Sequence, residues 1–200
     1  MARTEKGFTL IELMIVIAII AIIAAIAIPN LKEAERNANE TAAITSLRQY
    51  LSAQGIYHRT DYDLDGAKEY AQRLYTLYDY DGAVGPVEPI RLVDLPMARA
   101  EYTAGYITQG PRAGFYFADH VAGKDGVAFS PDADGDGFLD GFGLTAFPSK
   151  YNRTGLKTFV IDTEGTVYEN ILPNLDFDNQ AGLPIGWPDL DGEKWTVIDH

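Results

Sequence analysis

The chain has 200 residues, a length that suits one compact domain with a short extension and argues against a multidomain assembly. Its 16 basic and 29 acidic residues give a net charge of −13, and residues 61–200 hold ten of the basic and twenty-four of the acidic side chains. Such an acidic surface repels phosphate backbones, so nucleic acid is not an expected partner. The chain has no cysteine, which excludes disulfides, thiol catalysis and thiolate metal sites.

An apolar segment dominates the first thirty residues. Residues 13–28 are sixteen consecutive apolar residues, and residues 8–12 lengthen the segment with two polar interruptions, one of them Glu12. A helix that crosses a bilayer needs about 20 such residues. Arg3 and Lys6 precede the segment, and they predict a cytoplasmic N-terminus with the rest of the chain outside.

A secretory signal peptide is the alternative interpretation of this segment. The small residues around Ala25 and Ala27 resemble a signal cleavage site, and the preceding basic residues fit such a peptide. Against it, the apolar run is long and Glu12 lies within it. A carboxylate inside a membrane helix costs about 2.5–3.5 kcal/mol, so Glu12 is expected to have a function.

Residues 6–12, KGFTLIE, resemble the prepilin motif of type IV pilins and of the related type II secretion pseudopilins. The resemblance covers a short basic leader that ends in Gly7, the FTLIE sequence and the apolar helix behind it. It implies that a prepilin peptidase cuts after Gly7 and methylates the new N-terminus at Phe8. It also implies that Glu12 meets the amine of the next subunit during filament assembly.

Elementary electrostatics agrees with this assignment. A cut after Gly7 leaves a positive amine on Phe8, and Glu12 follows four residues later on the same helix face. In lipid each charge lowers the cost of burying the other. Between two subunits the same pairing would fix their axial register.

Four segments are therefore expected along the chain. They are a leader (1–7), a transmembrane and filament-core helix (8–29), an amphipathic helix that continues it (30–57) and a globular head (58–200). Pro29 removes one helical hydrogen bond and is expected to kink or loosen the helix. The predicted fold is α+β, with the long N-terminal helix packed on a small antiparallel sheet of the head, as the resemblance also implies.

The head mixes helical and strand patterns. Residues 67–78 show a short helical period, whereas residues 82–96 contain three prolines and are typical of a loop. Later segments rich in β-branched and aromatic residues are expected to form strands, namely residues 101–108, 114–121, 125–130, 143–148, 158–161 and 166–168. The last two are expected to pair as a hairpin through a turn at residues 162–165.

Residues 132–140 carry the clearest metal-binding pattern. Carboxylates stand at positions 1, 3, 5 and 9 of a calcium loop and a backbone carbonyl serves position 7, so the predicted ligands are Asp132, Asp134, Asp136, Phe138 through its carbonyl, and Asp140. Gly137 at position 6 is expected to permit a sharp turn. Gly143 replaces the closing glutamate of an EF-hand, so we expect a structural calcium ion without flanking helices. A solvated acidic turn is the alternative.

A second, weaker metal candidate precedes the predicted short helix. Its residues are Asp61, Asp63, Asp65 and Glu69, with the same early spacing. The alternative is that Asp65 caps a helix that begins at residue 67.

Catalytic patterns are missing from the sequence. The three histidines, His58, His120 and His200, are far apart and show no metal-binding spacing, and there is neither a nucleophile elbow nor a phosphate-binding loop. His120 follows a predicted strand and is expected to be a structural residue. We therefore expect no enzymatic activity.

The resemblance implies a structural subunit of a type II secretion pseudopilus or of a type IV pilus-like filament. The implied partners are copies of this chain and other pilin-like subunits, prepilin peptidase, and a secretion or pilus assembly platform at the inner membrane. Before assembly the protein is expected to be a single-pass inner-membrane protein with an external or periplasmic head. The lack of cysteine favours the pseudopilus. The alternatives are a membrane-tethered binding or adhesion module, whose helix is only an anchor, and a secreted hydrolase.

Overall fold

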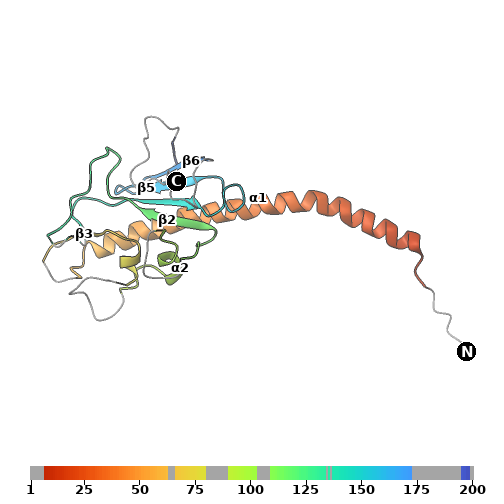
Figure 1. Ribbon diagram of the computed structural model, residues 1–200, viewed down its shortest axis with the longest axis horizontal. Coiled ribbons are helices and arrows are strands. Elements are labelled where there is room, and N and C mark those ends of the chain that lie inside the picture. Colours follow the sequence, from red (N-terminus) through yellow and green to blue (C-terminus); the bar gives the residue numbers. More distant parts are fainter. Residues whose placement is uncertain are drawn as a thin grey trace, which may run out of the picture. The chain divides into compact units, whose positions relative to one another are not determined.

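The computed structural model describes residues 7–62, 66–79, 90–102, 109–133, 135, 137–172 and 195–198 (Figure 1). In chain order its elements are α1 (Leu10–Tyr57), β1 (Tyr70–Ala71), the 3₁₀ helix η1 (Tyr75–Leu77), α2 (Leu95–Ala98), β2 (Phe115–Asp119), β3 (Gly137–Phe138), β4 (Leu144–Pro148), β5 (Thr158–Ile161), β6 (Val167–Asn170) and β7 (Thr196–Val197). The chain divides into two units, residues 1–35 and residues 36–200, and we call the second unit the head. The predicted α+β fold is confirmed.

Helix α1 is 48 residues long and contributes to both units. It continues through Pro29 and ends at Tyr57, where the predicted amphipathic helix also ends. Its first half is apolar on every side, whereas its second half buries one face. The buried residues recur three and four apart along the helix, as expected for an amphipathic helix packed on one side: Ala43, Ser46, Leu47, Tyr50, Ala53, Gln54 and Tyr57.

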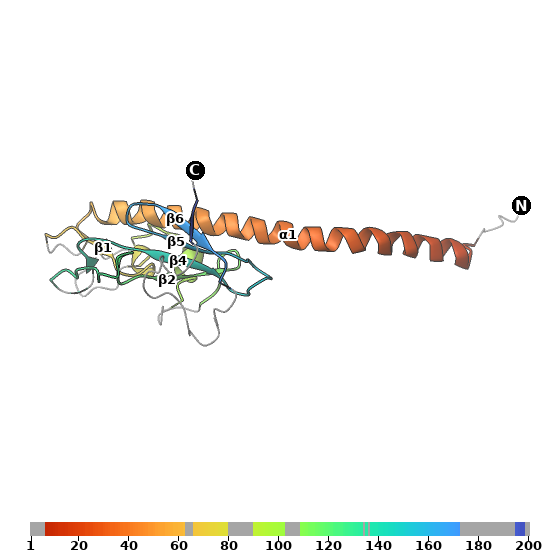
Figure 2. The same cartoon turned by 90° about the horizontal axis from the view of Figure 1, so that it is seen from above.

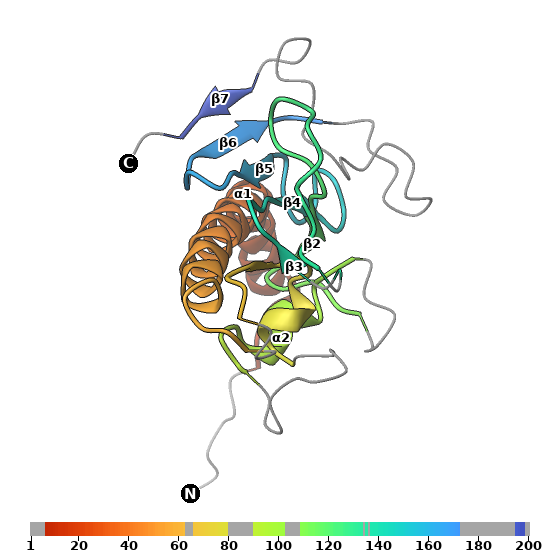
Figure 3. The same ribbon diagram turned by 90° about the vertical axis from the view of Figure 1, so that its left-hand side faces the viewer.

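The head contains a five-stranded antiparallel sheet in the order β2-β4-β5-β6-β7. Its strands lie along the head part of α1 (Figure 2) and curve around one side of that helix (Figure 3). The predicted hairpin is confirmed, because β5 and β6 pair as antiparallel neighbours. In the turn between them, Gly165 donates its N–H to the carbonyl of Asp162 at 2.9 Å. Gly165 has φ of +85°, a conformation that glycine adopts without steric cost.

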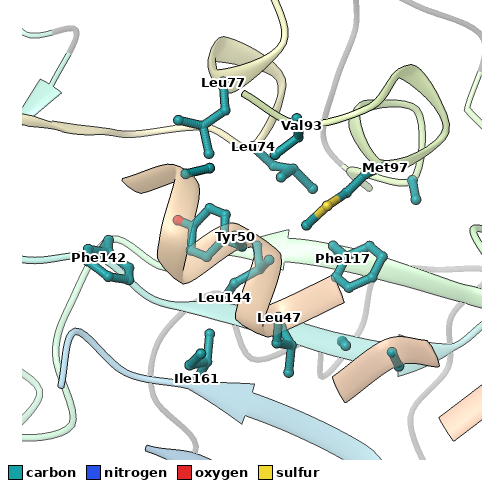
Figure 4. Packing of buried hydrophobic residues seen from close by; sticks show 14 of the residues in the cluster. Leu47, Tyr50, Leu74, Leu77, Val93, Met97, Phe117, Phe142, Leu144 and Ile161 are labelled. Carbon is teal, nitrogen blue, oxygen red and sulfur yellow. The ribbon is translucent and has the colours of Figure 1, made fainter. Parts of the chain in front are cut away.

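The core of the head lies on both sides of Tyr50 (Figure 4). One side is formed by the sheet, and the other by the segment around η1 and α2. The labelled core residues are Leu47 and Tyr50 from α1, Phe117, Phe142, Leu144 and Ile161 from the sheet region, and Leu74, Leu77, Val93 and Met97 from the covering segment. Sheet, helix and covering segment therefore share one hydrophobic core.

The helix predicted over residues 67–78 is wrong. That segment forms β1 and η1, and β1 pairs with β3. The reason is tertiary: the buried amide of Gln54 binds both the N–H of Ala71 at 2.9 Å and the carbonyl of Ala71 at 2.8 Å. These bonds occupy backbone groups that an α-helix would need for itself.

The other strand predictions for the head have mixed outcomes. Residues 115–119 and 144–148 form β2 and β4 as predicted. Residues 125–130 form no regular strand and contribute only a single bridge between Ala122 and Ala128. Most of the strand predicted over 101–108 lies outside the described residues.

Candidate functional site

The N-terminus of α1 is closed by a reciprocal pair of hydrogen bonds between Thr9 and Glu12. The carboxylate of Glu12 accepts the backbone N–H of Thr9 at 2.9 Å and its hydroxyl at 2.6 Å. In return the N–H of Glu12 approaches the Thr9 hydroxyl oxygen at 3.3 Å. This is a capping box, in which two otherwise unpaired N–H groups at the helix start are satisfied.

The predicted cleavage bond lies in the non-helical segment at the start of α1. Gly7 and Phe8 are exposed and precede the first helical residue, Leu10. A Cβ atom added at Gly7 would meet no atom within 4 Å. The described chain itself therefore does not require glycine there.

The helix surface behind the cap is apolar and uncovered. Between Phe8 and Leu31 the large hydrophobic side chains are each 48–87% exposed. The helix is long and apolar enough to cross a membrane, as judged by its length and composition. Burying this surface in lipid or against other apolar helices is strongly favourable, at about 25 cal/mol per Å².

The first acidic loop closes a short hairpin. Asp132 donates its N–H to the carbonyl of Gly137 at 3.2 Å, and its side chain accepts the N–H of Gly135 at 2.8 Å. At the other end, both carboxylate oxygens of Asp140 accept from Ser130, one from its N–H at 2.8 Å and one from its hydroxyl at 2.6 Å. These bonds, the hydroxyl first, lower the pKa of Asp140.

Two of the five predicted ligands in this loop, Asp134 and Asp136, lie outside the described residues. Phe138 is buried, with its ring 5.4 Å from that of Phe129. Where the structure describes the chain, no group of three or more aspartate, glutamate, histidine or cysteine side chains is placed to hold a metal ion. Calcium binding stays a prediction.

The expected role of Gly137 is wrong. Gly137 lies in β3 and does not have a positive φ, whereas Gly135 does, with φ of +86°. Its lack of a side chain matters for packing instead, because an added Cβ would lie 2.2 Å from the Cγ of Glu69. The glycine allows Glu69 to approach the backbone.

That contact brings the two acidic loops together, which the sequence did not reveal. Tyr70 pairs with Phe138 and Ala71 with Gly137 in the β1–β3 ladder. The amide of Gln72 extends the junction by donating to the carbonyls of Gly135 at 2.9 Å and Gly137 at 3.1 Å. Two segments more than sixty residues apart therefore form one surface.

The second acidic loop is only partly described. Asp61 accepts the N–H of Gly66 at 3.1 Å, and Glu69 is buried against the first loop. Asp63 and Asp65 lie outside the described residues. Because no helix begins at residue 67, the interpretation of Asp65 as the cap of such a helix is wrong.

The two histidines that the structure describes, His58 and His120, have structural surroundings. His120 is buried, its Nε2 lies 2.5 Å from the Thr145 hydroxyl, and burial lowers its pKa to about 4. The ring of His58 stacks on Tyr70 at 4.2 Å. A neutral buried imidazole of this kind serves packing rather than proton transfer.

An acidic pair in the interior of the head was not anticipated from the sequence. Glu101 has no exposed surface, and Asp119 ends β2 beside it. They approach because Glu101 forms a parallel bridge with Phe117 in β2. A bridge of one residue leaves no periodic pattern, so no sequence signal marks it.

Comparison with known proteins gives matches to two families. The family described as "Protein of unknown function (DUF2950)" matches residues 32–179. The family described as "Prokaryotic N-terminal methylation motif" matches residues 2–28.

Two characterised relatives are pilus components. The chain is 54% identical over 55 residues to "Type IV wide pilus major component PilA4" of Thermus thermophilus, a match covering 28% of this chain and 42% of the relative. It is 40% identical over 101 residues to "Type IV major pilin protein PilA" of Myxococcus xanthus, covering 48% of this chain and 46% of the relative. The chain thus spans less than half the length of each. No solved structure matches significantly. The resemblance to the pilin family is confirmed.

Proposed function

The chain belongs to the family described as "Protein of unknown function (DUF2950)" and carries the N-terminal methylation motif of type IV pilins, and from this premise we propose that it is a structural subunit of a type IV pilus-like filament. Both relatives are named as pilus components, which favours a surface pilus over a type II secretion pseudopilus. We further propose that a prepilin peptidase cuts between Gly7 and Phe8 and methylates Phe8.

The uncovered apolar helix with Glu12 near its start carries this proposal. A helix uncovered on every side from Phe8 to Leu31 needs lipid before assembly and other apolar helices after it. Exchange of one apolar environment for the other costs little, so subunits can leave the membrane for a filament. Glu12 is the exception, because its charge needs a partner in either place.

Processing would supply that partner. The cut removes Gly7 and leaves the amine of Phe8 four residues before Glu12, next to the start of the helix. The capping box with Thr9 already holds the carboxylate toward the N-terminal end of the helix. A neighbouring subunit's amine can then bind this carboxylate, and a slip of one turn would separate the two charges.

The solvent-facing side of α1 within the head supports packing between copies. The hydroxyls of Thr41, Thr45 and Ser52 each donate to the carbonyl four residues earlier, so they require no water or partner. The same stretch of helix carries the exposed cation Arg48 and no acidic residue, and the exposed cation Arg59 follows just beyond the end of the helix. The hydroxyls on this side are therefore easily desolvated, and its cations are complementary in charge to the acidic remainder of the chain.

We place the unassembled protein in the inner membrane with a single span, a cytoplasmic N-terminus and an external head. Arg3 and Lys6 support this orientation. Its proposed partners are further pilin-like subunits, the peptidase and an assembly platform.

Calcium binding by residues 132–140 is a second part of the proposal. The oxygen-only donor set suits a hard cation such as calcium. Asp140 fits less well, because ligation would have to replace its two bonds to Ser130. Bound calcium would add a charge-neutralising cross-link at the loop that meets Glu69.

The substitution Glu12→Ala tests the filament. Glu33→Ala is the matched control, because Glu33 is an exposed carboxylate of the same helix beyond the apolar segment. We expect Glu12→Ala to insert in the membrane and to be processed, but to yield few or no filaments in the sheared surface fraction, whereas Glu33→Ala assembles normally. Normal assembly of Glu12→Ala would favour a membrane-tethered binding module instead.

A further inference from the structure

Two acidic side chains, one fully buried and one partly buried, meet the start of η1 in the head. Asp119 ends β2, and Glu101 lies beside it through the bridge to Phe117. Glu101 is 0% exposed. Asp119 is partly exposed as a residue, but its Oδ2 atom is buried and has no hydrogen-bond partner among the described residues. Buried carboxylates are costly to ionise unless they are paired with cations or fully hydrogen-bonded.

The two carboxylates hold three consecutive residues. Asp119 accepts the N–H of Leu74 through Oδ1 at 3.0 Å. Glu101 accepts the N–H of Tyr75 at 2.5 Å and the guanidinium of Arg73 at 3.2 Å. Through these bonds the sheet holds the segment that covers the core, because Leu74 is itself fully buried.

Where the structure describes the chain, Arg73 is the cation that lies near these two acids. Arg73 faces the pair, and its guanidinium binds Glu101. From α1 the buried phenol of Tyr50 faces the same place, and burial together with Asp119 raises the pKa of that phenol. Burial first, and then the charge of Glu101, raises the pKa of the Asp119 carboxyl well above its usual range. Because Arg73 binds Glu101 directly and the Oδ2 atom of Asp119 has no hydrogen-bond partner among the described residues, the ionised form is less favoured at Asp119 than at Glu101.

We propose that Asp119 is a proton-controlled latch, which holds residues 73–77 on the sheet while its carboxyl is neutral and releases them when the carboxyl ionises. The charged form can regain hydration only by admitting water, and lifting the short η1 segment is the local opening that does so. This device belongs to the head and does not depend on filament assembly. The link to external pH rests on the proposed function: a subunit at the cell surface meets that pH directly, so the latch would couple it to the order of the covering segment.

The direction of the effect follows from linkage. A carboxyl whose pKa is raised on folding stabilises the fold below the unfolded value of about 3.9. That contribution is lost as the pH rises toward the raised folded value. In this window the opening equilibrium increases by about tenfold per pH unit.

Hydrogen exchange on the full-length protein in detergent micelles tests the latch. We would measure exchange at the amides of Leu74 and Tyr75 from pH 5 to pH 9, corrected for the intrinsic pH dependence. The wild type should show a pH-dependent gain in opening that is lost in Asp119→Asn, which keeps the side-chain shape and an acceptor for Leu74. The control Glu164→Gln, at an exposed carboxylate, should behave as the wild type.

A second measurement covers the case in which Asp119→Asn does not fold. Carboxyl ¹³C resonances of the wild type can be followed over the same pH range. An aspartate that titrates well above the ordinary value of about 3.9 supports the proposal. The proposal is overturned if every aspartate resonance titrates at or below that value, or if the variant and the wild type open with the same pH dependence.

Discussion

The carboxylate of Glu40 in α1 accepts the backbone N–H of Leu156 at 2.8 Å, in the loop between β4 and β5. The same oxygen lies 3.3 Å from the N–H of Lys157. Two further polar side chains of α1 reach this loop: Arg36 binds the side chain of Asn152 at 2.6 Å, and Asn39 binds the carbonyl of Thr154 at 3.0 Å. Polar side chains thus join the first residues of α1 in the head to the sheet.

Glu40→Ala should weaken this junction. The change leaves the N–H groups of Leu156 and Lys157 without their acceptor, and a hydrogen bond to a charged group is worth about 1.5–3 kcal/mol. Because Glu40 is only partly buried, we expect a loss in the free energy of unfolding near the lower end of that range. Denaturant unfolding of the full chain in micelles measures it. Glu33→Ala, the control, should change it by less than about 0.5 kcal/mol.

Gly137→Ala should destabilise the contact between the acidic loops. The new methyl group would overlap the side chain of Glu69, and relief requires a shift of a buried residue. Overpacking of this kind costs about 1–3 kcal/mol. Gly110→Ala is the control, because an added Cβ there meets nothing within 4 Å. Equal melting temperatures for the two variants would contradict the packing role of Gly137.

Thr9→Val should open the capping box at the start of α1. Valine has nearly the same shape but offers neither a donor nor an acceptor to Glu12, and loss of an N-cap costs about 0.5–2 kcal/mol. Thr9→Ser keeps the hydroxyl and is the control. We expect a lower yield of surface filaments for Thr9→Val and a normal yield for Thr9→Ser. If both variants assemble equally well, orientation of Glu12 by Thr9 has no part in assembly.

Asp134→Asn should abolish stabilisation by calcium if residues 132–140 bind this ion. Calcium that binds only the folded state raises the melting temperature, and a chelator reverses the effect. Asp125→Asn, outside the loop, should retain the calcium response. A melting temperature that is indifferent to calcium and chelator in the wild type would remove calcium from the account.

His120→Gln should reduce the sensitivity of the head to acid. Burial lowers the pKa of His120 to about 4, so the fold favours the neutral imidazole. Its contribution is complete above the unfolded value of about 6.5 and is lost as the pH falls toward 4. The shift corresponds to an upper bound of about 3 kcal/mol. Unfolding free energies measured between pH 7 and pH 4.5 should fall less in the variant; parallel curves would contradict this role.

A feature of the head could be predicted from the sequence only where its signal lies in one short stretch of the chain. Periodicity located the end of α1 at Tyr57, and the Asp162–Gly165 turn located the β5–β6 hairpin, because both signals are local. The β1–β3 ladder has only two residues per strand and joins distant segments, so no pattern marks it. Without a signal for this ladder, the local helical period of residues 67–78 led to the prediction of a helix there.

The residues of the candidate site also divide into those with a local sequence signal and those without one. The motif around Gly7, Phe8 and Glu12 is a contiguous stretch, and the structure adds only the capping bond of Thr9. The acidic pair of Glu101 and Asp119 forms because the bridge between Glu101 and Phe117 brings two separate segments side by side, and tertiary packing alone creates that bridge. Burial and charge pairing, which define that pair, cannot be read from residue types.

The N-terminal residue of the chain recovered from filaments tests the central claim most directly. Filaments sheared from the cell surface would be dissociated, and the mature N-terminus identified by mass spectrometry. The account predicts that the chain is present in the filaments and begins with N-methylated Phe8. A chain that begins elsewhere, or one found only as a membrane protein beside filaments built from other subunits, would contradict it.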